Sequence, residues 1–95
     1  MTSPDYQLFS LGSNPGLATE IASILDTNLA PIDVRQFADN EIYERIEHTV
    51  RGRDVYVVQG ISDPVNDNFM KLMIFIDAAR RASANTINVV LPYFG

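Results

Sequence analysis

Small polar side chains gather where an expected β-strand runs into an expected α-helix. The strand is the β-branched and aromatic run at 54–59, and Asp63, Pro64 and the side chains of 66–68 follow it. Open α/β proteins bind ligands at such strand-to-helix junctions, so these side chains are candidates for ligand contact. They are also typical of a capped helix start, because Asp63 can accept from free backbone N–H groups and Pro64 suits the first helical position. The residue types alone favour the capped helix.

Two pairs of arginines are candidates for binding anions. Arg51 and Arg53 flank a glycine, and Arg80 and Arg81 are adjacent. The whole chain carries a formal net charge of −5, which argues against binding nucleic acid or acidic membranes, since both need concentrated basic residues. We therefore expect only local anion sites. His48 is the single histidine, and we expect it to be exposed. A lone histidine with scattered carboxylates does not form a metal site.

A glycine-containing turn at 12–16 is a third candidate. In a flavodoxin-like domain such a turn could bind phosphate, but Gly-Ser-Asn-Pro-Gly is more often a helix cap. In the second interpretation Asn14 caps the helix and Pro15 takes its first position.

The elements that would position these residues alternate between strands and helices. Strands are expected at 6–11, 32–37, 41–46, 55–59 and 87–91, and helices from Pro15 and from Pro64 to about Ala84. The tripeptide at 38–40 predicts a hairpin between the second and third strands, because Asp and Asn tolerate the left-handed conformation. The strand at 55–59 is typical of one buried on both faces. Strands separated by helices predict parallel crossovers and a mostly parallel, helix-flanked sheet of the α/β class.

Apolar spacing predicts which faces enter the core. In the first helix the apolar residues are Leu17, Ile21, Ile24 and Leu25, and in the second they are Val65, Phe69, Leu72, Met73, Ile76 and Ala79. These three- and four-residue spacings are typical of a helix face that packs in a core. In the third strand, Ile42, Glu44 and Ile46 alternate with Tyr43, Arg45 and Glu47.

The composition is that of one small globular domain. The 95 residues are 46% hydrophobic and include no cysteine, which allows a modest core and suits a reducing cytosol. We expect no signal peptide, because the N-terminus lacks a basic and an apolar region, and no membrane span, because charges interrupt the apolar clusters. A cytoplasmic location follows as an expectation. The chain stops directly after an expected buried strand, so we expect it to be the first part of a longer domain.

The whole chain resembles the N-terminal part of the ribose-phosphate pyrophosphokinases, the phosphoribosyl pyrophosphate synthetase family. The matching segments follow the family's order over about residues 8 to 95: 37–41, 50–52, 54–59, 64–68, 80–84 and 92–95. The resemblance implies a phosphoribosyltransferase-like fold, of which residues 1–95 are an incomplete N-terminal segment. It implies an enzyme that uses Mg²⁺ to transfer the β,γ-diphosphoryl group of ATP to ribose 5-phosphate. It also implies a homo-oligomer, usually a hexamer built from dimers.

The segment at 37–41 resembles the family's loop that reaches the adenine of ATP bound to a neighbouring subunit. The resemblance implies an ATP contact by Phe37, Asp39, Asn40 and Glu41. A phenyl face can stack on a purine, and a carboxylate can accept from its exocyclic amine. Asn40 stands where many members have glycine, and asparagine can keep a positive φ. The alternative is a solvated turn with Phe37 packed in the core.

Thr49, Arg51 and Ser83 resemble positions that form an anion site between subunits in members controlled by phosphate and ADP. A guanidinium with neighbouring hydroxyls suits phosphate recognition. The resemblance implies that the segment that binds the ATP phosphates, the Mg²⁺ ligand, the catalytic loop and the ribose-5-phosphate loop all come after Gly95. We therefore expect no catalytic and no metal-binding residue in this chain, and no activity from these residues alone. The alternative is a non-catalytic synthetase-associated module that assembles with active subunits and regulates them.

Overall fold

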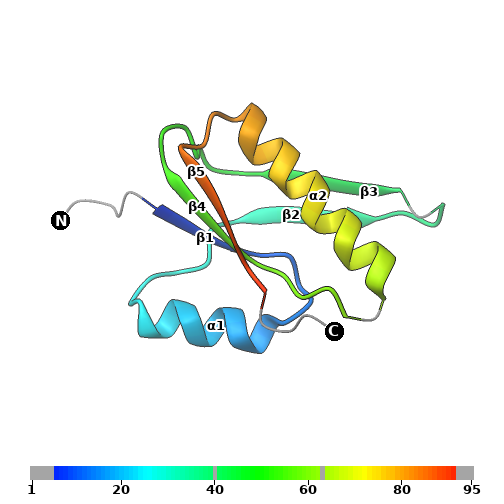
Figure 1. Cartoon of the computed structure of the whole chain (residues 1–95), viewed down its shortest axis with the longest axis horizontal. Coiled ribbons are helices and arrows are strands. Elements are labelled where there is room, and N and C mark those ends of the chain that lie inside the picture. The colour runs from blue at the N-terminus through cyan, green and yellow to red at the C-terminus, as the bar shows by residue number, and fades with distance from the viewer. Residues whose placement is uncertain (1–5, 40, 63, 92–95) are drawn as a thin grey trace.

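The computed structural model describes residues 6–39, 41–62 and 64–91, which form five strands and two helices (Figure 1). In chain order these are β1 (Tyr6–Ser10), α1 (Pro15–Ile24), β2 (Ile32–Gln36), β3 (Ile42–Ile46), β4 (Asp54–Val58), α2 (Val65–Arg81) and β5 (Thr86–Val90). Every element predicted from the sequence is present, although α2 ends short of Ala84. Neither helix of the described ranges is long and apolar enough to cross a membrane.

Three strands form a parallel sheet in the order β1-β4-β5. Phe9 of β1 lies opposite Val57 of β4, which in turn lies opposite Val89 of β5. The two helices pack on opposite faces of this sheet (Figure 1): α2 contacts the face of Phe9 and Val57, whereas α1 contacts the face of Leu8 and Val58. Parallel neighbours need long crossover connections, since no tight turn can join them. The predicted α/β class is confirmed.

β2 and β3 form a separate antiparallel hairpin that, among the described residues, does not pair with the parallel sheet. The hairpin extends alongside α2 (Figure 1). Val34 and Ile46 on its inner face pack against the core that α2 forms with the sheet. The position of the hairpin therefore depends on side-chain packing against α2 rather than on strand pairing with the sheet.

The first helix begins as the sequence predicts. The Asn14 side chain accepts a hydrogen bond from the Leu17 N–H at 3.4 Å, and Pro15 is the first helical residue. The turn before it is tied to the next strand-helix junction, because the Ser13 hydroxyl accepts from the Gly60 N–H at 2.6 Å. The helix-cap interpretation of the turn at 12–16 is confirmed.

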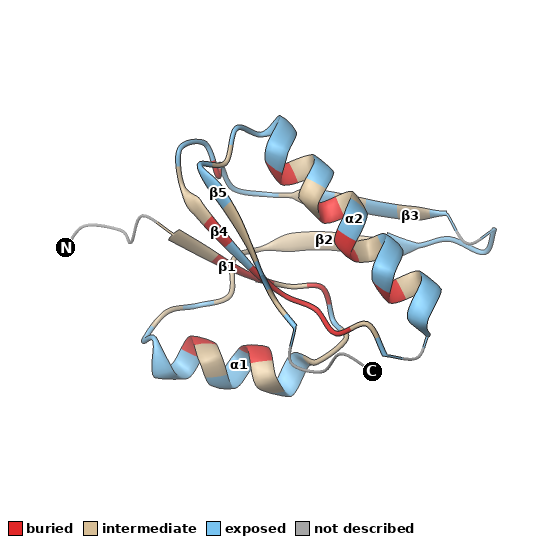
Figure 2. Ribbon diagram, in the orientation of Figure 1, coloured by how far each residue is buried: buried red, intermediate tan, exposed pale blue. Residues whose placement is uncertain are grey.

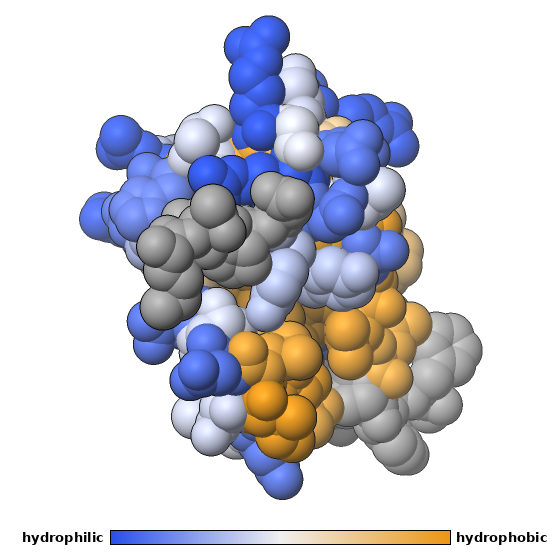
Figure 3. Space-filling model, turned by 90° about the vertical axis from the view of Figure 1, so that its left-hand side faces the viewer, coloured by the Kyte–Doolittle hydropathy of each residue, from blue (hydrophilic) through white to orange (hydrophobic). Residues whose placement is uncertain are grey.

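The buried face of α1 differs in part from the predicted one. Ala18 and Ala22 are buried, and Leu17 and Ile21 are partly buried beside them. Ile24, however, is 77% exposed, because it lies on the flank of the last turn. Leu25 is the C-cap residue and lines an open apolar pocket of about 330 Å³ between α1 and the sheet. Figure 3 shows apolar surface over this end of the molecule.

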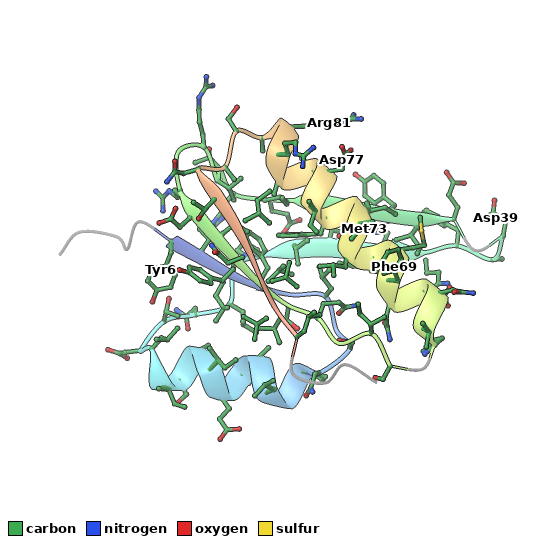
Figure 4. All side chains as sticks on the ribbon, viewed as in Figure 1. Tyr6, Asp39, Phe69, Met73, Asp77 and Arg81 are labelled. Atoms are coloured by element: carbon green, nitrogen blue, oxygen red, sulfur yellow. The ribbon has the colours of Figure 1, made fainter. Side chains whose placement is uncertain are left out.

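The buried face of α2 is also rotated from the predicted stripe. Its buried residues are Asn68, Leu72, Phe75 and Ala79 (Figure 2). Val65, Phe69 and Met73, which the spacing predicts in the core, are exposed, and Figure 4 shows the last two on the outer side of the helix. A polar residue fixes this orientation of α2, because the buried Asn68 side chain accepts from the Gln59 side chain and donates to the Ser62 carbonyl.

Two further expectations at β4 and α2 are wrong in detail. Val55, Val57 and Val58 of β4 are fully buried, but Tyr56 is exposed, because α1 covers only part of that face. Pro64 is the N-cap and not the first helical residue, since its backbone is extended with ψ 117°. The predicted cap residue Asp63 lies outside the described residues.

Buried hydrogen bonds join the end of β4 to the first turns of α2. The Gln59 side-chain N–H donates to the Asn68 carbonyl at 3.1 Å and to the Asn68 Oδ1 at 3.3 Å. Asn68 Nδ2 donates to the Ser62 carbonyl at 2.8 Å, and the Ser13 N–H donates to Gln59 Oε1 at 3.4 Å. The Gln59 and Asn68 side chains are thus occupied by protein partners, so these two residues act as a scaffold between β4 and α2.

Replacement of Asn68 by alanine should destabilise the protein by about 1–3 kcal/mol, because it removes the bond to the Ser62 carbonyl and one of the two bonds that the Gln59 side-chain N–H makes. Asn66→Ala is the matched control: this residue is exposed in the same helical turn, and its removal should change the unfolding free energy by less than about 0.5 kcal/mol. Urea unfolding of both variants measures the difference. Equal effects of the two substitutions would contradict the scaffold role.

Candidate functional site

The hairpin end lies at one extremity of the molecule, where Asp39 is labelled in Figure 4. The Phe37 N–H donates to the Glu41 carbonyl at 2.8 Å, which closes the turn. The Asp39 carboxylate accepts from the Glu41 N–H at 3.2 Å. The turn is thus held by hydrogen bonds between residues within it. Asn40 lies outside the described residues.

The side chains at this end face solvent. Phe37 is 50% exposed, and Asp39 and Glu41 are exposed as well. The alternative that Phe37 packs in the core is therefore wrong. Asp39 already uses one carboxylate oxygen to hold the turn, so the Glu41 carboxylate is the better placed of the two to accept from a ligand.

Two residues that the sequence analysis did not connect with Phe37 share its face of the hairpin. Arg35 pairs directly with Tyr43 across the strands, and the alternation of β2 places Arg35 on the same side as Phe37. Tyr43 is 45% exposed, and Arg35 forms an ion pair with Asp33 at 3.0 Å. The period-two pattern of residues 32–37 could have identified Arg35, and that of residues 42–47 could have identified Tyr43.

The second predicted group is brought together by two turns that are distant in sequence. The Gly52 N–H donates to the Ser83 carbonyl at 2.9 Å, and the Asn85 N–H donates to the Arg53 carbonyl at 2.8 Å. Thr49 lies in the same loop as Arg51, whose N–H donates to the Thr49 hydroxyl at 3.3 Å. The turns that carry Thr49, Arg51 and Ser83 are therefore joined by backbone hydrogen bonds, and all three side chains are exposed. His48 is also exposed, as expected.

Ser83 has a left-handed backbone conformation, with φ 65°. Glycine is the usual residue at this position after a helix, because it has no Cβ to clash with the backbone. Asp26 has the same conformation after α1, with φ 53°, so the conformation marks a helix end and does not by itself indicate a ligand.

The structure does not bring the two predicted groups into one site. The hairpin end and the turns at 49–53 and 82–85 lie at different ends of the molecule (Figure 1). Within the described ranges, no group of three histidine, cysteine, aspartate or glutamate side chains could hold a metal ion. This geometry leaves two separate surface regions, one aromatic and acidic and the other with an arginine and two hydroxyls.

Comparison with solved structures supports the fold. The phosphoribosylpyrophosphate synthetase from Mycobacterium smegmatis superimposes with a TM-score of 0.90 at 37% identity, over 94% of this chain and 30% of that chain. The purine phosphoribosyltransferase from Pyrococcus horikoshii superimposes with a TM-score of 0.67 at 18% identity, over 93% of this chain and 59% of that chain. At that lower identity the second likeness concerns the fold alone, and it confirms the predicted phosphoribosyltransferase-like architecture.

Sequence comparison identifies the family. The ribose-phosphate pyrophosphokinase of Fusobacterium nucleatum is 53% identical over 96% of this chain, and that of Bacillus subtilis is 51% identical over 96% of it. The chain spans 29% of the length of each of these relatives. The family model for the N-terminal domain of ribose phosphate pyrophosphokinase matches residues 6–95. This chain therefore belongs to the ribose-phosphate pyrophosphokinase family, as part of its N-terminal domain.

Proposed function

We propose that residues 1–95 are an N-terminal segment of an active phosphoribosyl pyrophosphate synthetase. This enzyme transfers the β,γ-diphosphoryl group of ATP to the C1 hydroxyl of ribose 5-phosphate and releases AMP. The observation that carries the proposal is the 53% identity over 96% of the chain with a protein named as a ribose-phosphate pyrophosphokinase. The described residues do not fit a Mg²⁺ site, so we assign the metal and the catalytic groups to the rest of the enzyme.

In this proposal the hairpin contributes the adenine contact of an ATP molecule bound mainly by a neighbouring subunit. The half-exposed ring of Phe37 provides a face for stacking, and Glu41 provides an acceptor for the exocyclic amine. Asp39 supports the site by holding the turn, and Asn40 is assigned to the same contact. The position of the hairpin end at one extremity of the molecule suits a contact with another subunit.

The second region is proposed as a regulatory anion site at a subunit interface. Arg51 supplies the positive charge, and the hydroxyls of Thr49 and Ser83 supply neutral donors beside it. The two backbone hydrogen bonds between the turns support this assignment, because they hold the three residues in fixed relation. Ser83 also keeps a side chain at a backbone position where glycine is less strained.

Phe37→Ala in the full-length enzyme should weaken ATP binding by about 1–3 kcal/mol if the ring stacks on the base. Isothermal titration calorimetry with ATP measures the change. Tyr56→Ala is the control, because it removes an exposed aromatic side chain from β4, in the other sheet. An ATP affinity that Phe37→Ala leaves unchanged would remove the adenine assignment.

Arg51→Ala in the full-length enzyme should reduce inhibition by ADP or activation by phosphate, and should leave the unregulated rate intact. The physical reason is loss of the charged donor to the anion. Arg45→Ala, at an exposed arginine of β3, should keep normal regulation. Initial rates at increasing ADP and phosphate measure both.

Ser83→Gly separates a ligand role from a folding role at the same position. Glycine relieves the left-handed backbone, so thermal stability should be kept or increased. Regulation by ADP or phosphate should nevertheless weaken, because the hydroxyl is lost. A variant that gains stability and keeps full regulation would restrict Ser83 to the helix end.

The 95-residue chain alone should form no AMP from ATP and ribose 5-phosphate, since the proposed phosphate and metal contacts lie outside it. Chromatographic detection of AMP provides the assay, with the full-length enzyme as the positive control. Activity that co-purifies with the 95-residue chain and resists further purification would show that the catalytic groups are in these residues.

A further inference from the structure

The inner face of the hairpin contains an ionisable residue in an apolar setting. Glu44 lies on β3 between Ile42 and Ile46, on the side that packs along α2. Val34 is its partner across the hairpin. Both carboxylate oxygens of Glu44 are buried and, among the described residues, neither has a hydrogen-bond partner. A carboxylate ion in this position is costly, whereas the neutral acid loses much less hydration on burial.

The charges around Glu44 offer little compensation. The inward residues of β2 are Ile32, Val34 and Gln36, which carry no charge. Lys71, a half-buried residue of α2, is the one charged group of the described chain found to act on Glu44. Burial raises the pKa of Glu44 to about 8, and the positive charge of Lys71 opposes this shift only in part.

The structure of the hairpin makes its packing sensitive to this one group. β2 and β3 pair with each other and not with the parallel sheet within the described ranges. Side-chain contacts with α2 and the core beside it must therefore hold the hairpin in place. A change of charge within those contacts acts directly on the position of the hairpin.

We propose that Glu44 is a proton-dependent latch between the hairpin and α2: the neutral acid allows the two to pack, and loss of its proton loosens them. The direction of the pH dependence follows from the difference in proton binding between the closed and the open state. The closed state binds the proton more tightly than the open state, in which Glu44 has its ordinary pKa of 4.5. The stabilisation is complete below that value and is lost as the pH rises towards about 8. This inference goes beyond the proposed function, because it concerns packing and does not depend on which ligand the hairpin binds.

Hydrogen–deuterium exchange of the full-length protein tests the latch. After correction for the intrinsic pH dependence of exchange, the opening of the β2–β3 amides should rise by up to about tenfold per pH unit between pH 6 and 8. It should level off at higher pH. The amides of β1 and β4 provide the internal reference, because they belong to the parallel sheet. Hairpin protection that does not depend on pH would overturn the proposal.

Two substitutions distinguish the latch from general alkaline loosening. Glu44→Gln has nearly the same shape but cannot ionise, so the pH dependence of hairpin opening should disappear. Glu47→Gln, at an exposed glutamate directly after β3, should behave as the unmodified protein. If hairpin opening still depends on pH in Glu44→Gln, the proposal is contradicted.

A direct titration covers the case in which Glu44→Gln does not fold. Carbon-13 labelling of the glutamate carboxyl groups should show one resonance with a midpoint near pH 8, as the raised pKa requires. Lys71→Met should move this midpoint to higher pH, because it removes the nearby positive charge. If every glutamate titrates near its ordinary value, Glu44 is not a buried acid and the latch is refuted.

Discussion

The hydrogen bonds between Gln59 and Asn68 set which face of α2 packs on the parallel sheet. They join the end of the central strand β4 to the first turns of α2, and both side chains are buried. With Asn68 held inward, the residues that follow on the same helical face enter the core: Leu72, Phe75 and Ala79. The Phe75 ring then packs 5.0 Å from that of Phe9, measured between ring centroids, which fixes α2 on the sheet.

The orientation of α2 has consequences beyond the sheet, because the hairpin packs against the same helix. The rotation that buries Phe75 leaves Phe69 and Met73 exposed and places Lys71 near the inner face of β3. The hairpin has no strand pairing with the parallel sheet in the part of the chain that the structure describes. It can thus project its aromatic tip away from the body, and its stability depends on the side-chain layer that contains Glu44. The scaffold, the proposed ATP contact and the proton-linked latch are parts of one packing arrangement.

The sequence was sufficient to predict the elements, their order and the α/β class. Alternating and helical spacings report which segments are strands or helices, and the Asn14 cap was predicted from its local pattern. Spacing was not sufficient to choose between overlapping apolar faces of α2, since Phe69 and Phe75 fit different stripes equally well. The deciding interaction is a polar one between residues on two elements, Gln59 and Asn68, and no periodicity reports it.

The candidate sites were predictable to different extents. For Phe37 the residue types left a core position open, and the resemblance to the family selected the exposed one that the structure has. The joining of the Arg51 and Ser83 turns rests on a hydrogen bond between distant backbone groups, which no local pattern contains. The inward position of Glu44 follows from the alternation of β3, but its lack of a partner depends on the packing of α2.

We propose that the hairpin of this segment contacts the adenine of a neighbouring subunit's ATP through its closed turn. A crystal structure of the full-length protein with a non-hydrolysable ATP analogue would show whether this contact forms. We expect the Phe37 ring to stack on the adenine of an analogue bound mainly by another subunit, with Glu41 near its exocyclic amine. An adenine that makes no contact with residues 37–41 would contradict it.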